Sequence, residues 1–331
     1  MNLPIVGIAI IGVALFFDFI NGFHDSANVV ATMISSRAMS ARKALALSAV
    51  ANFCGPFLFG VAVATTIGQE VIAPQSITIV VILAALLAAI IWNLATWYFG
   101  IPSSSSHALV GGLIGAVSID FGFATIQMRG LLKVIAVLFV SPILGLVVGY
   151  LFMKLVLFLA RGASPRINSF FKRSQVITSL ALALSHGSND AQKTMGIIAM
   201  ALVTIGYSSE FSVPWWVVAL SAGAISLGTA MGGWRIIRTL GGKFYKIRPV
   251  HGFTTQIASA CIILGAAFLG GPVSTTHVVS SAILGVGSAE RVSRVRWNVV
   301  GNILVAWVLT IPASALLAAL LHLVIHLLLG S

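Results

Sequence analysis

The segment "FFDFINGFHDSANVVATMISS" (residues 16–36) interrupts a long apolar run with two aspartates, a histidine and two asparagines. Four of these side chains are spaced by three, four and three residues and so share one helix face: Asp18, Asn21, Asp25 and Asn28. An aspartate at the centre of a membrane-spanning helix costs about 2.5 to 3.5 kcal/mol on insertion, so it needs a cation, a proton or a basic partner. The segment predicts a polar site inside a membrane domain, with a satisfied interface between helices as the simpler alternative.

The composition of the whole chain supports a membrane protein. Only 8% of its 331 residues are charged and 59% are hydrophobic, whereas a soluble globular protein has about 25% charged residues. Most of its surface must therefore face lipid. Continuous apolar windows such as 77–100 and 296–329 meet the length of about 20 residues that a transmembrane helix requires. The sequence predicts an all-α polytopic membrane protein that crosses the plasma (bacterial inner) membrane many times.

The net charge of +12 comes mainly from four short clusters, which hold 15 of the 19 Lys and Arg residues: 37–43, 161–173, 235–248 and 291–296. Clusters that flank apolar segments are typical of cytoplasmic loops under the positive-inside rule. They are not typical of a surface that binds nucleic acid, so no nucleic-acid partner is expected. The expected surroundings are a lipid bilayer, with the four clusters on its cytoplasmic side.

Ten apolar segments are predicted, five on each side of a basic linker: 4–36, 44–67, 76–99, 102–119, 130–159, 174–206, 213–232, 251–269, 272–288 and 298–329. Some of them could be re-entrant at the midplane, which would lower the number of complete crossings. The predicted organisation is a first transmembrane repeat (1–160), a basic cytoplasmic linker (161–173) and a second transmembrane repeat (174–331).

The two halves resemble each other in sequence. "FHDSANVVATMI" (23–34) matches "SNDAQKTMGIIA" (188–199) through the aspartates. "IPSSSSHALVGGLIG" (101–115) matches "GPVSTTHVVSSAILG" (271–285) at an offset of 170. With an odd number of spans in each half, the second copy enters the membrane from the opposite side. This is an inverted repeat, whose site is expected near the midplane where the copies meet.

Segments 4–36 and 174–206 are unusually long. Each has 33 residues, about 50 Å as a straight helix, against a hydrocarbon core of about 30 Å. Each carries its polar motif in the middle, beside Gly22 or Gly187, which supply backbone freedom. We therefore predict that both helices break at mid-membrane and expose backbone groups to a cavity.

Two hydroxyl runs, "PSSSSH" (102–107) and "PVSTTH" (272–277), each follow a proline at the start of an apolar segment. Ser and Thr there are ordinary N-caps, which is the structural alternative. Two equivalent helix starts would instead offer free N–H groups, positive dipole ends and hydroxyls to a tetrahedral oxyanion. The predicted anion ligands are Ser104, Ser105, Ser106, Ser274, Thr275 and Thr276.

Four basic side chains in or beside these motifs have open roles. His107 and His277 end the hydroxyl runs and are candidates for a proton or gating role, with a hydrogen-bonded helix contact as the alternative. His24, next to the first aspartate, is a candidate for handling a proton or a metal ion. Lys193 lies three residues after Asp190 and either pairs with it or faces the anion.

Four long motifs occur in order: "NGFHDSANVVATMISSRAMS" (21–40), "IIWNLATWYFGIPSSSSHALVGGLIG" (90–115), "SHGSNDAQKTMGIIAMALV" (185–203) and "GPVSTTHVVSSAILG" (271–285). With them the chain resembles the inorganic phosphate transporter (PiT) family, most of all its bacterial low-affinity Pit-type permeases. The resemblance implies phosphate uptake by symport with protons or sodium. Many members have Asn before the first aspartate, whereas His24 is a variant associated with the proton-coupled branch. We therefore predict H⁺ as the coupling ion, with Na⁺ as the alternative.

The predicted mechanism is alternating access by a secondary active symporter that imports phosphate. Phosphate is expected between the repeats, on the two hydroxyl runs and Lys193. The coupling cation or proton is assigned to Asp25, Asn28, Asn189, Asp190, Gln192 and His24. No cofactor and no bound metal is required, although Asp25 and Asp190 would hold sodium if sodium is the coupling ion. No GxxxxGK[ST] motif occurs, so an ion gradient is expected to supply the energy.

Several alternatives stay open. A sulfate permease of the same family would use the same motifs, and the substrate could be a metal–phosphate complex. A passive anion channel would also use hydroxyls and helix ends. An intramembrane hydrolase would need Ser, His and Asp, but no G-x-S-x-G motif occurs, so an enzyme is not expected. The chain is either a monomer or a homo-oligomer.

Overall fold

The computed structural model describes residues 4–72 and 76–329, and this part of the chain is helical apart from its connections and one isolated bridge. The elements of the first half are α1 (Ile5–Ser35), α2 (Ala41–Leu58), α3 (Ala62–Thr65), η1 (Thr66–Glu70), α4 (Ile79–Phe99), α5 (Ser105–Asp120), η3 (Phe123–Thr125) and α6 (Met128–Leu159). Those of the second half are α7 (Ile167–Thr204), α8 (Trp215–Met231), α9 (Trp234–Arg238), η4 (Thr239–Lys243), α10 (Pro249–Phe268), α11 (Thr275–Glu290), η5 (Val292–Arg294) and α12 (Trp297–Leu329).

The predicted all-α membrane architecture is confirmed. Among the described residues, five helices are long and apolar enough to cross a membrane: α1, α4, α6, α10 and α12. The number rises to seven if each of two bent pairs is one span. The bend is 73° between α2 and the segment Ala62–Glu70, and 58° between α8 and the segment Trp234–Lys243. Both halves thus follow one order: long helix, bent pair, helix, short helix, long helix.

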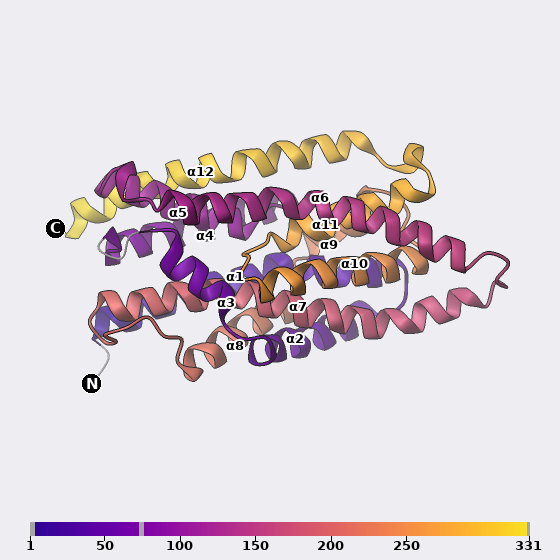
Figure 1. Cartoon of the computed structure of the whole chain (residues 1–331), viewed down its shortest axis with the longest axis horizontal. Coiled ribbons are helices and arrows are strands. Elements are labelled where there is room, and N and C mark those ends of the chain that lie inside the picture. Colours follow the sequence, from indigo (N-terminus) through magenta and orange to yellow (C-terminus); the bar gives the residue numbers. More distant parts are fainter. Residues whose placement is uncertain (1–3, 73–75, 330–331) are drawn as a thin grey trace.

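Each short helix belongs to a hairpin that returns to the end at which it entered. Before α4 and after α5, Ile72 and Ile126 form an antiparallel bridge. Before α10 and after α11, the Arg296 N–H donates to the Phe244 carbonyl at 3.0 Å. The two hairpins enter from opposite ends of the molecule, and their tips meet near its middle (Figure 1).

These hairpins are the re-entrant alternative that the sequence left open, and they replace the separate crossings predicted for segments 76–99, 102–119, 251–269 and 272–288. The helices α5 and α11 have 16 residues each, about 24 Å, which is less than the hydrocarbon core of about 30 Å. Their polar starts lie in the protein interior, where the opposite hairpin contacts them: Ser106 Oγ donates to the Val273 carbonyl at 3.1 Å. Each half still has an odd number of complete crossings.

The long helices α1 and α7 are continuous, so the predicted breaks at Gly22 and Gly187 are wrong. A Cβ atom on Gly22 would lie 2.1 Å from the Ile225 carbonyl oxygen of α8, and one on Gly187 would lie 2.3 Å from the Asn52 carbonyl oxygen of α2. These glycines permit two backbones to touch. The actual bends are in α2–α3 and α8–α9, which pack around the two long helices.

Further glycines join each hairpin to the last helix of the opposite half. A Cβ atom on Gly115 of α5 would lie 2.0 Å from the Ala315 carbonyl oxygen of α12. One on Gly285 of α11 would lie 2.1 Å from the Leu146 carbonyl oxygen of α6. We call these four close contacts, α1–α8, α7–α2, α5–α12 and α11–α6, the glycine seams. Each seam has an equivalent in the other half, as an inverted repeat requires, and the boundaries at 160 and 174 stay a prediction.

Residues from all four basic clusters gather at one end of the molecule, although Arg235 contacts the Tyr98 carbonyl at the tip of the first hairpin. The α6–α7 connection lies opposite the end where α1 begins and α12 ends (Figure 1). At that end Ser36 Oγ donates to Gln175 Oε1 at 2.9 Å, and Gln175 Nε2 donates to the Pro249 carbonyl at 3.1 Å. Beside them Glu290 pairs with Arg248 and Arg294. Burial raises the pKa of Glu290, but Arg248, His251 and Arg294 outweigh it and leave that pKa below its usual value.

The two ends should be distinguishable by labelling. Single cysteines at Ser169 and Ser293, which are exposed at the basic end, should react with an impermeant thiol reagent from the cytoplasm, because basic segments stay inside. Cysteines at the exposed Gln69 and Ser209 should react only from outside. The two native cysteines, both exposed on the surface of the protein, are first replaced by alanine. Labelling of Ser169 and Gln69 from one side would exclude the inverted arrangement.

Candidate functional site

The predicted site residues converge where the middles of α1 and α7 meet the two hairpin tips. All of them are buried: His24, Asp25, Asn28, Ser104, Ser105, Ser106, His107, Asn189, Asp190, Gln192, Lys193, Ser274, Thr275, Thr276 and His277. They come from four elements that are far apart in sequence, so the fold brings together what the motifs predicted separately. Their contacts, however, divide them into three groups.

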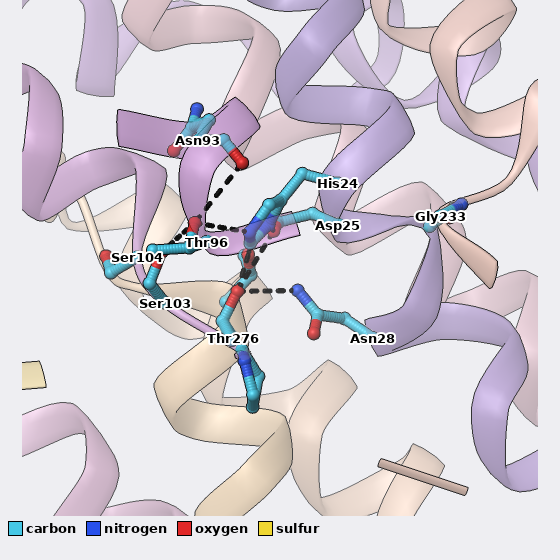
Figure 2. A network of polar contacts seen from close by, with 12 residues as sticks. His24, Asp25, Asn28, Asn93, Thr96, Ser103, Ser104, Gly233 and Thr276 are labelled. Carbon is cyan, nitrogen blue, oxygen red and sulfur yellow. Dashed lines mark hydrogen bonds and ion pairs between the residues drawn. The ribbon is translucent and has the colours of Figure 1, made fainter. Parts of the chain in front are cut away.

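The first group surrounds Asp25. His24 Nδ1 lies 2.6 Å from Asp25 Oδ1, and Thr276 Oγ1 lies 3.1 Å from both carboxylate oxygens. The other side of the imidazole, His24 Nε2, lies 3.2 Å from Thr96 Oγ1, which in turn accepts a hydrogen bond from Ser103 Oγ at 2.9 Å. Figure 2 shows His24 between Asp25 and Thr96, with Asn28 reaching Thr276 from the other side. A proton on this imidazole is therefore held by partners at both nitrogens.

The second group surrounds Asp190. Lys193 Nζ lies 2.5 Å from Asp190 Oδ1, and His186 Nε2 lies 3.2 Å from Asp190 Oδ2. Thr275 Oγ1 lies 3.0 Å from Asp190 Oδ2 and 3.2 Å from Asp25 Oδ2. A hydroxyl has one proton, so Thr275 donates to one carboxylate at a time. The two aspartates thus form one connected site, and cationic or protonated neighbours must offset their mutual repulsion.

Lys193 lies at the centre of the tip contact. Besides Asp190, its ammonium group contacts Ser106 Oγ at 2.6 Å and the Val273 carbonyl at 2.9 Å. An ammonium group has three donors, so all of them are used in this arrangement. The sequence left two roles open for Lys193, and in the structure this residue pairs with Asp190. A phosphate contact from Lys193 stays a prediction.

The side chains of the third group form hydrogen bonds with backbone groups of neighbouring elements. Gln192 Oε1 accepts hydrogen bonds from the Val63 and Ala64 N–H groups at 2.8 and 3.4 Å, which lie just after the bend and lack partners within their own short helix. Asn189 Nδ2 donates to the Gly271 carbonyl at 3.1 Å, in the tip of the second hairpin. A coupling role for Gln192 and Asn189 stays a prediction.

The hydroxyl runs include the N-caps that the sequence offered as an alternative. Ser104 Oγ accepts from the His107 N–H at 3.1 Å, and Ser274 Oγ accepts from the His277 N–H at 3.2 Å. Of the hydroxyls that follow the caps, Thr275 and Thr276 contact Asp25 and Ser106 contacts Lys193. Ser104 and Ser274, which were also predicted as anion ligands, thus serve as caps here, and an anion contact from either run stays a prediction.

His107 and His277 lie against each other, with ring centroids 4.5 Å apart. His277 also stacks on Trp307 at 3.8 Å. Both rings line a mainly apolar cavity of about 540 Å³ among α6, α11 and α12. These contacts between helices are ring stacking and not the hydrogen-bonded contact that the sequence offered as an alternative. A proton or gating role stays a prediction.

Two residues of the site were missed by reasoning from sequence. His186 lies four residues before Asp190, on the same helix face, and this spacing was the available signal. Thr96 is a single hydroxyl in an apolar run, which carried no signal. Ligand atoms of Asp25, His186 and Asp190 lie within 4.8 Å of one another, so these three could hold a cation. Within residues 4–72 and 76–329, Asn28 Oδ1 also has no hydrogen-bond partner and is available as a further oxygen ligand.

Comparison with known proteins agrees with this fold. The chain is 47% identical to a "Probable low-affinity inorganic phosphate transporter" of Bacillus subtilis (strain 168) over 98% of both chains. It is 49% identical to a protein of the same description from Rhizobium meliloti (strain 1021) over 95% of both. A solved structure described as "The sodium-dependent phosphate transporter" matches with a TM-score of 0.88 and 25% identity, covering 98% of this chain and all of that one. The model of the phosphate transporter family matches residues 21–318, and the chain belongs to this family of membrane transporters.

Proposed function

We propose that the chain is a secondary active symporter that imports inorganic phosphate together with a cation, by alternating access. The observation that carries this proposal is the contact of Asp25 and Asp190 with one hydroxyl, Thr275, at the point where two helices begin. The carboxylates attract a cation and the helix starts attract an anion. The doubly loaded carrier and the empty carrier are then both near neutral and can reorient. A carrier with only one ligand is charged, and charge inside a membrane opposes reorientation.

The phosphate would lie on the starts of α5 and α11. These starts offer N–H groups and the hydroxyl of Ser105, without a buried arginine. The hydroxyl of Thr275 would have to turn its proton from the aspartates to the phosphate. Neutral donors bind a tetrahedral oxyanion without holding it so tightly that release becomes slow. Sulfate has the same shape, so it is the competitor to test.

The cation would be a proton held at Asp25. The short contact of 2.6 Å between His24 Nδ1 and Asp25 Oδ1 allows one proton to be shared between imidazole and carboxylate. The similar solved structure is described as sodium-dependent, so sodium is the alternative, with Asp25, Asn28 Oδ1 and Thr276 Oγ1 as oxygen ligands.

The direct test uses purified protein in proteoliposomes. Labelled phosphate should accumulate above its equilibrium level when a proton gradient is imposed, and sulfate in excess should leave most of this uptake intact. Accumulation under a sodium gradient alone would identify sodium as the coupling ion. Equilibration without accumulation under either gradient would show a passive channel and would overturn the proposal.

Replacing His24 with asparagine, the residue at the equivalent position of the second repeat, should separate coupling from binding. We expect proton-driven uptake to fall about 10- to 150-fold, since a charge-assisted hydrogen bond contributes about 1.5 to 3 kcal/mol. Exchange of labelled for unlabelled phosphate should persist, because it needs no net proton movement. The matched control is His326→Asn, an exposed histidine of α12. Unchanged proton-driven uptake in His24→Asn would remove His24 from the coupling site.

A further inference from the structure

The two repeats differ at one buried position that faces the site. Asn28 and Lys193 each lie three residues after the aspartate of their repeat. Asn28 Nδ2 donates to Thr276 Oγ1 at 3.0 Å, and Lys193 Nζ donates to Ser106 Oγ at 2.6 Å. These two hydroxyls are themselves equivalent, at the offset of 170. The same contact is therefore made twice, once by a neutral amide and once by an ammonium group.

The surroundings of Lys193 are those of a fixed charge. Its side chain is 1% exposed and lies 2.5 Å from Asp190. A charge at this depth is retained when it is paired and all of its donors are used. Ser106 and the Val273 carbonyl take the two remaining donors. No N–H donor of Lys193 is therefore free to bind a transported substrate.

The surroundings of Asn28 are those of an open cation site. Its Oδ1 atom is buried and has no hydrogen-bond partner within residues 4–72 and 76–329. Thr276 Oγ1 and the carboxylate of Asp25 lie beside the amide nitrogen of Asn28, so a 180° turn of this amide would add Oδ1 to their oxygens. A proton or a small cation can bind among these oxygens. At the equivalent place in the second repeat the ammonium group of Lys193 already occupies that position.

We propose that Lys193 is a tethered cation: it permanently balances Asp190 and replaces a second transported cation, so that only the Asp25 half exchanges a cation with the solution. The inference rests on the proposed symport and adds its charge ratio. Other ionisable groups near the pair are His186 beside Asp190, His24 beside Asp25, and Asp18 on the same face of α1 as Asp25. Whichever of these groups are protonated, removing the ammonium group of Lys193 makes the net charge of the carrier more negative by one unit.

The test replaces Lys193 with asparagine, which copies the first repeat. The number of cations carried per phosphate should rise by one, because the vacated position then binds a cation from the solution together with phosphate and releases it together with phosphate, as the Asp25 half does. To measure this ratio, the proton and sodium gradients are held fixed and the phosphate gradient is varied until the net phosphate flux is zero. Lys193→Arg, which keeps the charge, and Lys154→Asn, at an exposed position of α6, should keep the ratio of the unmodified protein.

If the Lys193→Asn protein folds but does not transport phosphate, its melting temperature provides a second test. Sodium or lithium should then raise its melting temperature, since an ion that binds only the folded state stabilises it, and Lys193→Arg should show no such rise. An unchanged transport ratio would overturn the proposal, as would an inactive Lys193→Asn protein that neither sodium, lithium nor a lower pH stabilises more than it stabilises Lys193→Arg.

A charge-neutral double variant covers the remaining case, in which Lys193→Asn does not fold. Combined with Asp190→Asn it removes both members of the pair, so it should regain uptake that Asp190→Asn alone lacks, at the unmodified ratio. A double variant no better than Asp190→Asn would refute the tethered cation. If the unmodified protein shows no uphill phosphate uptake, the proposed function itself fails, and this result is separate from every outcome above.

Discussion

Asp25→Asn should abolish gradient-driven phosphate uptake, with a loss of about 100-fold or more. Removing one charged partner from a buried ionic site costs about 3 to 5 kcal/mol. Asp25 contacts His24 at 2.6 Å and the Thr276 hydroxyl at 3.1 Å, and asparagine cannot hold a proton or cation between them. The measurement is accumulation of labelled phosphate in proteoliposomes under an imposed proton gradient. Asp190→Asn should show a similar loss, because it leaves Lys193 buried without its partner.

The control for these variants is Asp120→Asn, which removes a carboxylate at the far end of α5, beside His322. It should transport at the unmodified rate. Phosphate exchange at zero gradient should partly persist in Asp25→Asn, since exchange needs no reorientation of the empty carrier. If Asp25→Asn still accumulated phosphate fully, Asp25 would not be an essential coupling group.

A single added methyl group at Gly22 should have the largest effect on stability. In Gly22→Ala the new Cβ atom would lie 2.1 Å from the Ile225 carbonyl oxygen and 3.0 Å from its Cα atom, and backbone atoms cannot move aside. Overpacking a core typically costs about 1 to 3 kcal/mol, and a clash with rigid backbone lies at the upper end. We expect a melting temperature well below that of the unmodified protein, or no monodisperse protein after extraction.

Gly12→Ala is the matched control, because it lies in the same helix and its Cβ atom would meet nothing within 4 Å. Alanine has a helix propensity about 1 kcal/mol better than glycine, so this variant should be unchanged or slightly more stable. A Gly22→Ala protein as stable as Gly12→Ala would contradict the close approach of α1 and α8, and a flexible α1 would again be the better interpretation.

The membrane architecture and the central carboxylates could be predicted because they carry large free-energy costs. An aspartate inside an apolar run demands compensation wherever the helix lies, so Asp25 and Asp190 identify the site by themselves. The same holds for the hydroxyl runs, whose proline and serine positions define helix starts. A duplicated motif makes both inferences stronger, because each copy predicts the surroundings of the other.

The role of Gly22 could not be predicted, since a glycine serves a break and a close backbone contact equally well. Only the neighbour decides, and Ile225 lies about 200 positions away in the chain. Long-range partners also explain why Thr96 was missed and why α4 and α5 were taken for two crossings. The reversal at Gly100 is stabilised from the second repeat, where Thr239 Oγ1 donates to its carbonyl at 2.8 Å.

The glycine seams divide the molecule into parts with different mechanical properties. Where backbones touch, as in α1–α8 and α7–α2, any sliding brings main-chain atoms into collision, so these helices move as one block. In the same way, the seams α5–α12 and α11–α6 attach the short helix of each hairpin to a long outer helix, so that the two move together. The contacts of α1 with α4 are instead made by side chains such as Phe23 and Trp97, with rings 5.1 Å apart, which can repack by changing rotamer. Shear between packed helices is therefore expected along this boundary, with the outer helices moving relative to a stiff central block.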